Sequence, residues 1–255
     1  MYLKRAAAMA LAAAIMLPSS AALSQRAAPG VTYSTNAGIA PQKRPDPRRF
    51  DKRVAAYLEE DAKARPAPCK ILFIGSATIA VWKSLEADMA PNPVIGRGLG
   101  GSTVEDEMFY FDKIVTPYRP RAIFIYVGEN DIVNGLTPAE VLTDFTSFMQ
   151  MKRKALGTTP VYYISAKAAP ARLAFARGEQ AANDLIEKLA RTQRDLHYID
   201  VSHPMWEGGR LFDTLRPIYR EDGIHLTEEG YGIITRIIKP YVDKEAKRAT
   251  VCTSS

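Results

Sequence analysis

Four short segments of the chain stand out, and three of them carry groups that together could perform acyl transfer. Asp222 and His225 stand three residues apart in EDGIHLT, a spacing that lets a carboxylate orient an imidazole as a general base. Gly101 in RGLGGST offers an unobstructed backbone N–H, and Asn130 in GEND offers an amide donor. Such donors stabilise the charge that develops on a carbonyl oxygen. We therefore predict Asp222 and His225 as catalytic residues, with Gly101 and Asn130 binding the oxyanion.

The elements that must position these residues alternate between strands and helices. Strand-like apolar runs lie at 70–75, 93–96, 121–128, 160–165 and 197–201, and helical patterns at 79–87, 104–111, 138–156, 172–194 and 227–247. This alternation predicts an α/β fold with a five-stranded parallel sheet between helical layers, in the spatial order 2-1-3-4-5. Ligands bind outside the carboxyl ends of such strands, which is where the chemical segments fall.

The chain before this domain divides into three parts. Residues 1–24 predict a signal peptide, because Lys4 and Arg5 precede a short apolar run and small residues suited to cleavage. The run is shorter than the roughly 20 residues that span a bilayer, so we expect a periplasmic or secreted protein without stable membrane insertion after cleavage; an uncleaved anchor is the alternative. Residues 25–48 predict a flexible linker. An amphipathic helix at 49–66 should follow, with an apolar face of Phe50, Val54, Tyr57 and Leu58.

Charge and cysteine content restrict the partners. The net charge is +6, but residues 66–255 hold 23 basic and 23 acidic residues, so the domain at 67–247 and its tail at 248–255 predict no nucleic-acid partner. Cys69 and Cys252 are compatible with a disulfide in an oxidising compartment, although the sequence does not give their distance. The oligomeric state stays open.

The four segments in this order resemble the SGNH hydrolases, also called the GDSL esterase/lipase family, in a bacterial branch with a GSSS-type first segment. The resemblance covers about residues 70–241 and includes FIGSATIAVW, RGLGGST, GEND and DGIHLT. It implies a flavodoxin-like three-layer α/β/α sandwich and a serine esterase, with acetylated carbohydrates as the substrate class by analogy. No long lid segment lies between the motifs, which favours short acyl chains such as acetyl on small molecules or glycans. The resemblance also implies a triad completed by Asp222 and His225, and neither a metal nor an organic cofactor.

The position of the nucleophile holds an alanine. In the family pattern G-D-S-I-x-x-x-W, the serine stands two residues after the glycine and five before the tryptophan, and both Gly75 and Trp82 point to Ala77. Ala77 keeps a backbone N–H for the oxyanion but has no oxygen that could attack, so we expect almost no turnover.

Three explanations of Ala77 stay open. The serine was replaced deliberately, or the chain is a non-catalytic binding protein for acylated glycan or lipid, or Ser76 or Thr78 serves as the nucleophile. Acyl transfer to a sugar would use the same residues as hydrolysis.

Four further residues lie near the expected site. His197 and His203 have no evident partner at catalytic spacing, and we predict structural roles for both. Lys167 and Arg172 follow the fourth strand; we predict solvated loop cations, with recognition of an anionic substrate group as the alternative.

Overall fold

The computed structural model describes residues 44–206 and 218–248. Its centre is a parallel sheet of five strands, β1 (Ile71–Gly75), β2 (Val94–Gly98), β3 (Ala122–Tyr126), β4 (Val161–Ile164) and β5 (Leu196–Ile199). The strand order is β2-β1-β3-β4-β5, so the predicted fold class and order are confirmed. The predicted signal peptide, most of the linker and nearly all of the tail lie outside the described residues.

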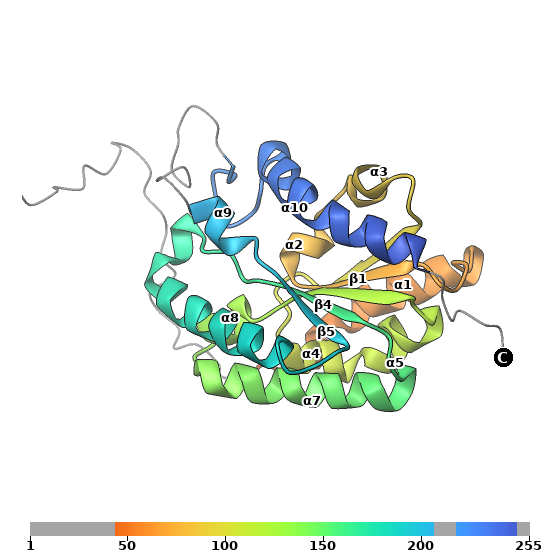
Figure 1. Ribbon diagram of the computed structural model, residues 1–255, viewed down its shortest axis with the longest axis horizontal. Coiled ribbons are helices and arrows are strands. Elements are labelled where there is room, and N and C mark those ends of the chain that lie inside the picture. Colours follow the sequence, from red (N-terminus) through yellow and green to blue (C-terminus); the bar gives the residue numbers. More distant parts are fainter. Residues whose placement is uncertain (1–43, 207–217, 249–255) are drawn as a thin grey trace, which may run out of the picture. The chain divides into compact units, whose positions relative to one another are not determined.

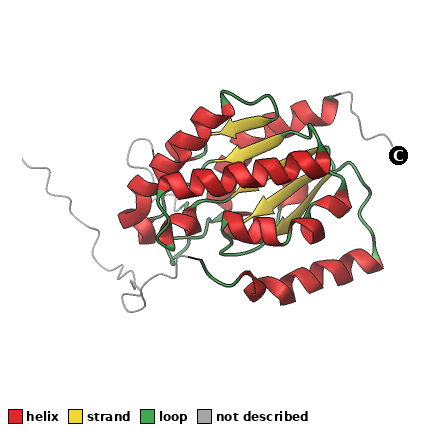
Figure 2. Ribbon diagram, turned by 90° about the horizontal axis from the view of Figure 1, so that it is seen from below, coloured by secondary structure: helices red, strands yellow, loops and turns green. Residues whose placement is uncertain are grey.

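Helices cover both faces of the sheet (Figures 1 and 2). On one face pack α1 (Asp51–Lys63), α4 (Val104–Phe109), α5 (Phe111–Ile114), α7 (Pro138–Leu156) and α8 (Ala176–Ala190). The other face carries α2 (Ala77–Ala80), α3 (Leu85–Met89), α9 (Ser202–Trp206) and α10 (Glu228–Lys247). Shorter elements are α6 (Glu129–Val133) and the 3₁₀ turns η1 (Pro47–Phe50), η2 (Thr116–Tyr118) and η3 (Pro170–Phe175). This arrangement gives the α/β/α sandwich.

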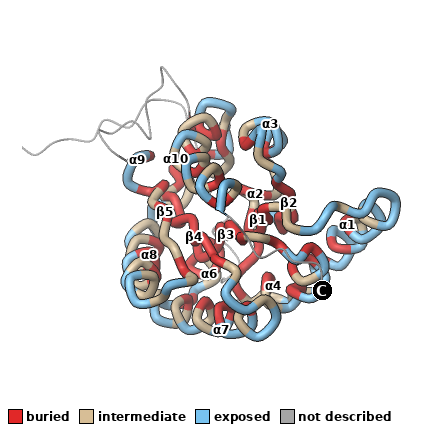
Figure 3. Tube along the Cα trace, turned by 45° about the vertical axis from the view of Figure 1, so that its right-hand side comes forward, coloured by how far each residue is buried: buried red, intermediate tan, exposed pale blue. Residues whose placement is uncertain are grey.

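The strands are apolar on both sides because helices bury both faces of the sheet. Every residue of β1 and β3 is buried, and Figure 3 shows the buried residues concentrated along the strands. On the α10 face, an aromatic ladder runs across four neighbouring strands, with ring centroids 4.5–4.8 Å apart. It consists of Phe73, Phe124, Tyr162 and His197. The stacking gives His197 the structural role that we predicted.

Three local predictions differ from the structure. The predicted helix 79–87 is broken into α2 and α3, because Trp82 turns into the core against Phe73 and Tyr231. Strand β2 extends through Gly98, two residues beyond the predicted run. The predicted apolar face of α1 included Leu58, but this residue is 41% exposed. Of the residues of α1, only Val54 and Tyr57 are buried.

Two observations concern the predictions about the membrane and the disulfide. Within the described ranges no helix is both long and apolar enough to cross a membrane. Cys69 is disulfide-bonded; Cys252, the partner considered from the sequence, lies outside the described residues.

Replacing Gly75 by alanine should lower the free energy of unfolding by about 3 kcal/mol or more. The added Cβ would lie 2.1 Å from the carbonyl oxygen of Tyr126, and the φ of +117° disfavours any side chain. Gly135 is the matched control, because its φ is +92° and nothing lies within 4 Å of an added Cβ. Gly135→Ala should therefore cost only about 1–2 kcal/mol of backbone strain. Urea unfolding followed by circular dichroism measures both, and equal losses would contradict the steric argument.

Candidate active site

The turn after β1 exposes Ala77 and buries its two neighbours. Ser76 donates its N–H to the carbonyl oxygen of Tyr126 at 2.9 Å, and its hydroxyl accepts the N–H of Ala77 at 2.6 Å. Ala77 is the first residue of α2 and is half-buried, whereas Ser76 and Thr78 are 0% and 5% exposed. Position 77 is therefore the one that this turn presents toward the outside.

The hydroxyl of Ser76 is occupied by contacts inside the protein. It accepts the Asn130 amide at 2.8 Å and lies 3.3 Å from a carboxylate oxygen of Glu129. The carbonyl oxygen of Thr78 accepts the hydroxyl of Tyr231 at 2.9 Å. Burial disfavours both Ser76 and Thr78 as substitute nucleophiles, and the side-chain hydrogen bonds further disfavour Ser76.

The loop after β2 places a free backbone donor beside this turn. Gly101 has a φ of +89°, and its N–H donates no hydrogen bond to the described part of the chain. Asn130 donates its second amide proton to the carbonyl oxygen of Ser102 at 3.1 Å. A capping box between Thr103 and Asp106 then starts α4 and fixes the loop. Gly101 and Asn130 are thus brought to neighbouring positions.

Asn130 is held in a fixed orientation at the start of α6. Its Oδ1 accepts a hydrogen bond from the Arg172 guanidinium at 3.0 Å, and both amide protons donate, to Ser76 and Ser102. The side chain is 6% exposed. Because every polar group of this amide has a partner, an incoming carbonyl oxygen would have to share one of its protons.

Asp222 and His225 form a close pair on the turn before α10. His225 Nδ1 lies 2.7 Å from Asp222 Oδ2, while Asp222 Oδ1 accepts the N–H groups of Ile224 and His225 at 2.8 and 2.9 Å. Burial alone would raise the pKa of Asp222, but these bonds, the one from the His225 ring first, lower it to about 2. The carboxylate is therefore ionised over the whole neutral range and fixes the ring through Nδ1.

Hydrogen bonds from the loop after β4 hold this turn against the other loops. The N–H of Ala171 donates to the carbonyl oxygen of Gly223 at 3.1 Å, and the ammonium of Lys167 donates to that of Ile224 at 3.1 Å. Arg172, from the same loop, holds Asn130. The structure thus connects the segments of Ala77, Gly101, Asn130, Asp222 and His225 at one end of the sheet; the chemical roles of these residues stay predictions.

A cluster of buried charges lies beneath these loops. Glu129 accepts the hydroxyl of Tyr126 at 2.5 Å and faces Lys167 at 4.0 Å and Arg172 at 3.8 Å. Lys167 is 1% exposed, so the prediction of a solvated cation was wrong for this residue. Burial lowers its pKa, against the opposing effect of the carboxylates of Glu129 and Glu179. Sequence alone missed this cluster, because Glu129 and Lys167 are 38 positions apart and the GEND motif predicts a role for Asn130 and not for Glu129.

A second Asp–His pair was also missed. Asp200 Oδ2 lies 2.7 Å from His203 Nδ1, and Asp200 Oδ1 accepts the N–H groups of Ser202 and His203 at 3.0 and 3.1 Å. The expectation that His203 lacks a partner was therefore wrong. The same D-x-x-H spacing that identified Asp222 and His225 was present in DVSH and would have found it.

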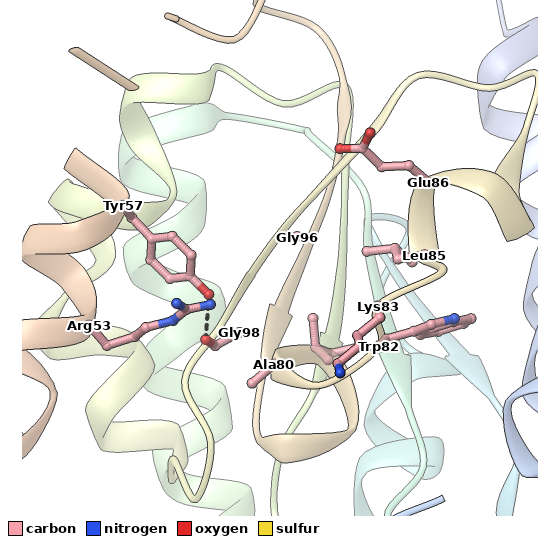
Figure 4. Close-up of a pocket in the computed structure, with 10 residues that line it drawn as sticks. Arg53, Tyr57, Ala80, Trp82, Lys83, Leu85, Glu86, Gly96 and Gly98 are labelled. Carbon is pink, nitrogen blue, oxygen red and sulfur yellow. Dashed lines mark hydrogen bonds between the residues drawn. The ribbon is translucent and has the colours of Figure 1, made fainter. Parts of the chain in front are cut away.

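A pocket of about 240 Å³ lies beside α2 and α3, between them and α1. Figure 4 shows Arg53 on the α1 side of the pocket and Lys83 on the opposite side, with Ala80 and Gly98 close together between them. Tyr57 lines the pocket and donates its hydroxyl to the carbonyl oxygen of Gly98 at 2.7 Å. Ala80, which lines this pocket, lies three residues after Ala77 on α2, but none of the predicted site residues lines the pocket itself. Among the described residues, no group of three or more His, Cys, Asp or Glu side chains is arranged to hold a metal ion.

Comparison with known proteins gives one family. The model of the GDSL-like Lipase/Acylhydrolase family matches residues 75–233. Comparison with curated proteins gives no match.

Solved structures with a similar fold include a GDSL-like lipase from Bacteroides thetaiotaomicron (24% identity, TM-score 0.60, covering 78% of this chain and 98% of that one). A lipase/acylhydrolase from Enterococcus faecalis is 18% identical, with a TM-score of 0.57 and coverages of 72% and 100%. A catalytic mutant of an acetylxylan esterase from Geobacillus stearothermophilus is 16% identical, with a TM-score of 0.57 and coverages of 72% and 98%. At these identities the likeness shows the fold.

Glu107, on α4 behind the Gly101 loop, should make stability depend on pH. Its carboxyl oxygens are buried without a hydrogen-bond partner. Burial raises its pKa from 4.5 to about 8; the nearby Ser102 hydroxyl lowers it in part, and the charges of Asp106 and Asp131 raise it further. The folded protein thus keeps a proton that the unfolded chain releases near pH 4.5, so the free energy of unfolding falls as pH rises from there to about 8.

Glu107→Gln should flatten this decline by about 1.4 kcal/mol per pH unit within that window. Urea unfolding at several pH values between 5 and 8 measures the slope. The exposed Glu59 is the control, and Glu59→Gln should leave the slope unchanged. An unaltered slope in Glu107→Gln would mean that Glu107 is ionised in the folded protein.

Proposed function

Because the chain belongs to the GDSL-like lipase/acylhydrolase family, we propose that its site is built as that of a short-chain acyl esterase but binds acyl esters without hydrolysing them. One observation carries the proposal. Ala77 occupies the presented position at the start of α2, while the Asp222–His225 pair keeps its 2.7 Å contact. This contact supports a site in which His225 and Asp222 could activate a nucleophile and the attacking oxygen is missing.

A serine at position 77 would complete the reaction of the family. Its hydroxyl would give its proton to His225 as the oxygen bonds to the carbonyl carbon, and Asp222 would stabilise the resulting imidazolium. The electron pair of the carbonyl bond would move to oxygen, where the N–H groups of residues 77 and 101 and the Asn130 amide would donate hydrogen bonds. The methyl group of Ala77 cannot form the first bond, but these donors and the walls of the site remain for binding.

The contacts of the donors suggest how a carbonyl oxygen would enter. The N–H of Gly101 has no acceptor among the described residues, so it is the first donor available to a ligand. Asn130 would then exchange its bond to Ser76 or Ser102 for one to the ligand. Arg172 holds the other end of this amide, which limits the exchange to a small adjustment.

The surroundings support a short acyl group on a polar alcohol. The pocket next to α2 is lined by the charged side chains of Arg53, Lys83 and Glu86, which suits a hydroxyl-rich group better than a hydrocarbon tail. A fold relative is described as an acetylxylan esterase, and an acetylated carbohydrate fits the same pattern. We also propose that the protein acts after export, in the periplasm or outside the cell, because residues 1–24 resemble a signal peptide.

Ala77→Ser should convert the chain into an active esterase on p-nitrophenyl acetate and butyrate. Loss of the nucleophile in serine–histidine enzymes lowers turnover by about 10⁶, so we expect a gain of several orders of magnitude over the unchanged chain. Adding His225→Ala to Ala77→Ser should abolish the gain. Release of p-nitrophenol measures all three proteins.

Other results would overturn parts of this proposal. If Ala77→Ser is as inert as the unchanged chain and circular dichroism shows it folded, the site is not that of an esterase. If the unchanged chain is equally active, Ser76 or Thr78 supplies the oxygen, and Ser76→Ala and Thr78→Val would identify which.

A further inference from the structure

Arg172 extends from the loop after β4 to a buried amide on another loop. Its guanidinium nitrogen Nη1 donates to Asn130 Oδ1 at 3.0 Å. The side chain of Arg172 is 22% exposed, and Asn130 is 6% exposed. The backbone of this loop is anchored, since the N–H of Arg172 donates to the carbonyl oxygen of Ala169 at 2.8 Å. The N–H of Ala171 donates to that of Gly223 at 3.1 Å. The fold therefore holds the guanidinium at the amide.

The contacts of the Asn130 amide permit only one of its two orientations. Guanidinium nitrogens are donors only, so Arg172 can pair with Oδ1 but not with the NH₂ group. The carbonyl oxygen of Ser102 only accepts, so it pairs with Nδ2, at 3.1 Å. A turned amide would set donor against donor at Arg172 and acceptor against acceptor at Ser102. The NH₂ group is therefore directed to Ser76 and Ser102, the chain neighbours of the other two predicted oxyanion donors.

The positive charge of Arg172 also strengthens this amide as a donor. Hydrogen bonds from an ionised group are roughly twice as strong as neutral ones. Such a bond at Oδ1 polarises the Asn130 amide, so that its N–H groups donate more strongly. The effect is larger in a buried site than in water, because the local dielectric constant is lower. The strengthened protons are those that we predict to bind a carbonyl oxygen, where negative charge develops during acyl transfer.

Glu129 supplies the counter-charge for Arg172 and leaves its donor available. Glu129 Oε1 lies 3.8 Å from Arg172 Nη1, which is too far for a hydrogen bond but close enough for attraction inside the protein. The carboxylate instead accepts the hydroxyl of Tyr126 at 2.5 Å. It also faces Lys167 at 4.0 Å, so one carboxylate offsets two cations. Arg172 thereby keeps Nη1 as a donor for the amide.

We propose that Arg172 is a positioning residue that sets both the orientation and the donor strength of the Asn130 amide. It thereby tunes how strongly the candidate site binds a carbonyl oxygen that gains negative charge. This consequence rests on the proposed function, whereas the coupling of the guanidinium to the amide does not. The role differs from both that the sequence suggested for Arg172, a solvated loop cation and a contact to an anionic substrate group.

The ¹H–¹⁵N spectra of the unchanged chain test the coupling directly, because they record the side-chain NH₂ group of Asn130. Arg172→Met removes the charge and the donor, and it should move both NH₂ proton resonances of Asn130 upfield. Arg172→Lys keeps a charge and carries donors only, so its resonances should stay close to those of the unchanged chain. Arg177→Met is the matched control. This exposed arginine lies five positions further along, in α8, and its loss should leave the Asn130 resonances in place.

Kinetics in the Ala77→Ser protein test the consequence. Arg172→Met should lower kcat for p-nitrophenyl acetate by about 10- to 100-fold, less than the loss of a whole oxyanion donor. KM should change by less than about threefold, because the strengthened donor acts mainly on the charge of the transition state. Arg172→Lys should recover most of kcat. Arg172→Gln can donate to Oδ1 but has no charge, so its kcat should fall between the other two and separate orientation from polarisation.

Three results would count against this role. Unmoved Asn130 resonances in Arg172→Met, with circular dichroism showing a folded protein, would mean that Arg172 does not act on the amide. Equal losses of kcat in Arg172→Met and Arg172→Lys would mean that the substitutions only disturb packing. A raised KM for the p-nitrophenyl ester of succinate, with the acetate ester unaffected, would mean that Arg172 binds an anionic substrate group.

Two further outcomes keep this inference separate from folding and from the esterase proposal. If Arg172→Met does not fold, Arg172→Gln decides, because its Asn130 resonances should move in the same direction by a smaller amount. If the resonances move in Arg172→Met but Ala77→Ser is inert, the coupling is supported and the esterase proposal fails.

Discussion

The close approach of β1 to the backbone of β3 is the constraint on which the candidate site depends. An added Cβ at Gly75 would lie 2.1 Å from the carbonyl oxygen of Tyr126, and the next residue, Ser76, bonds to that same oxygen. Gly98 makes a similar approach to the backbone of Ala80. Because β1 packs closely on β3 and β2 packs closely on the end of α2, the turn that carries position 77 is held at the carboxyl ends of these strands. Asn130 donates to Ser76 beside position 77 and to Ser102 beside Gly101, and the N–H of Leu99 donates to the carbonyl oxygen of Gly75 at 2.7 Å.

Buried ionisable groups gather beneath these loops rather than in the centre of the core. Glu129, Lys167 and Glu179 are at most 3% exposed, and burying such groups lowers stability unless they are well paired. The pairing here is incomplete, since Glu179 has no hydrogen bond and Lys167 stands 4.0 Å from Glu129. Buried ionisable groups with shifted pKa values are often found at binding and catalytic sites in folded proteins. The cluster also contacts the candidate site, since Lys167 donates to the carbonyl oxygen of Ile224 beside His225 and Arg172 donates to Asn130.

Much of this architecture could be predicted, because it follows from local pattern. Alternating strands and helices specify a parallel sheet and its order, and the motifs place the loops. What the sequence did not reveal depends on contacts between distant positions. Leu58 belongs to the apolar face of α1 in the sequence, but only Val54 and Tyr57 of this helix are buried against the rest of the domain. Lys167 is buried by Tyr219 and Glu129 from other loops. His203 is a different case, because its partner Asp200 lies only three residues away and the D-x-x-H spacing is visible in DVSH.

The aromatic ladder of Phe73, Phe124, Tyr162 and His197 has a consequence for how the chain reaches this structure. Each ring stacks on its cross-strand neighbour, and each pair is in direct register. A strand that pairs one residue out of register turns every side chain to the opposite face, so such an error removes its ring from the ladder and opens a gap in the α10 layer. Parallel sheets assemble slowly because their contacts are distant in sequence. The ladder thus makes misaligned intermediates costly and favours the one alignment in which all four rings meet.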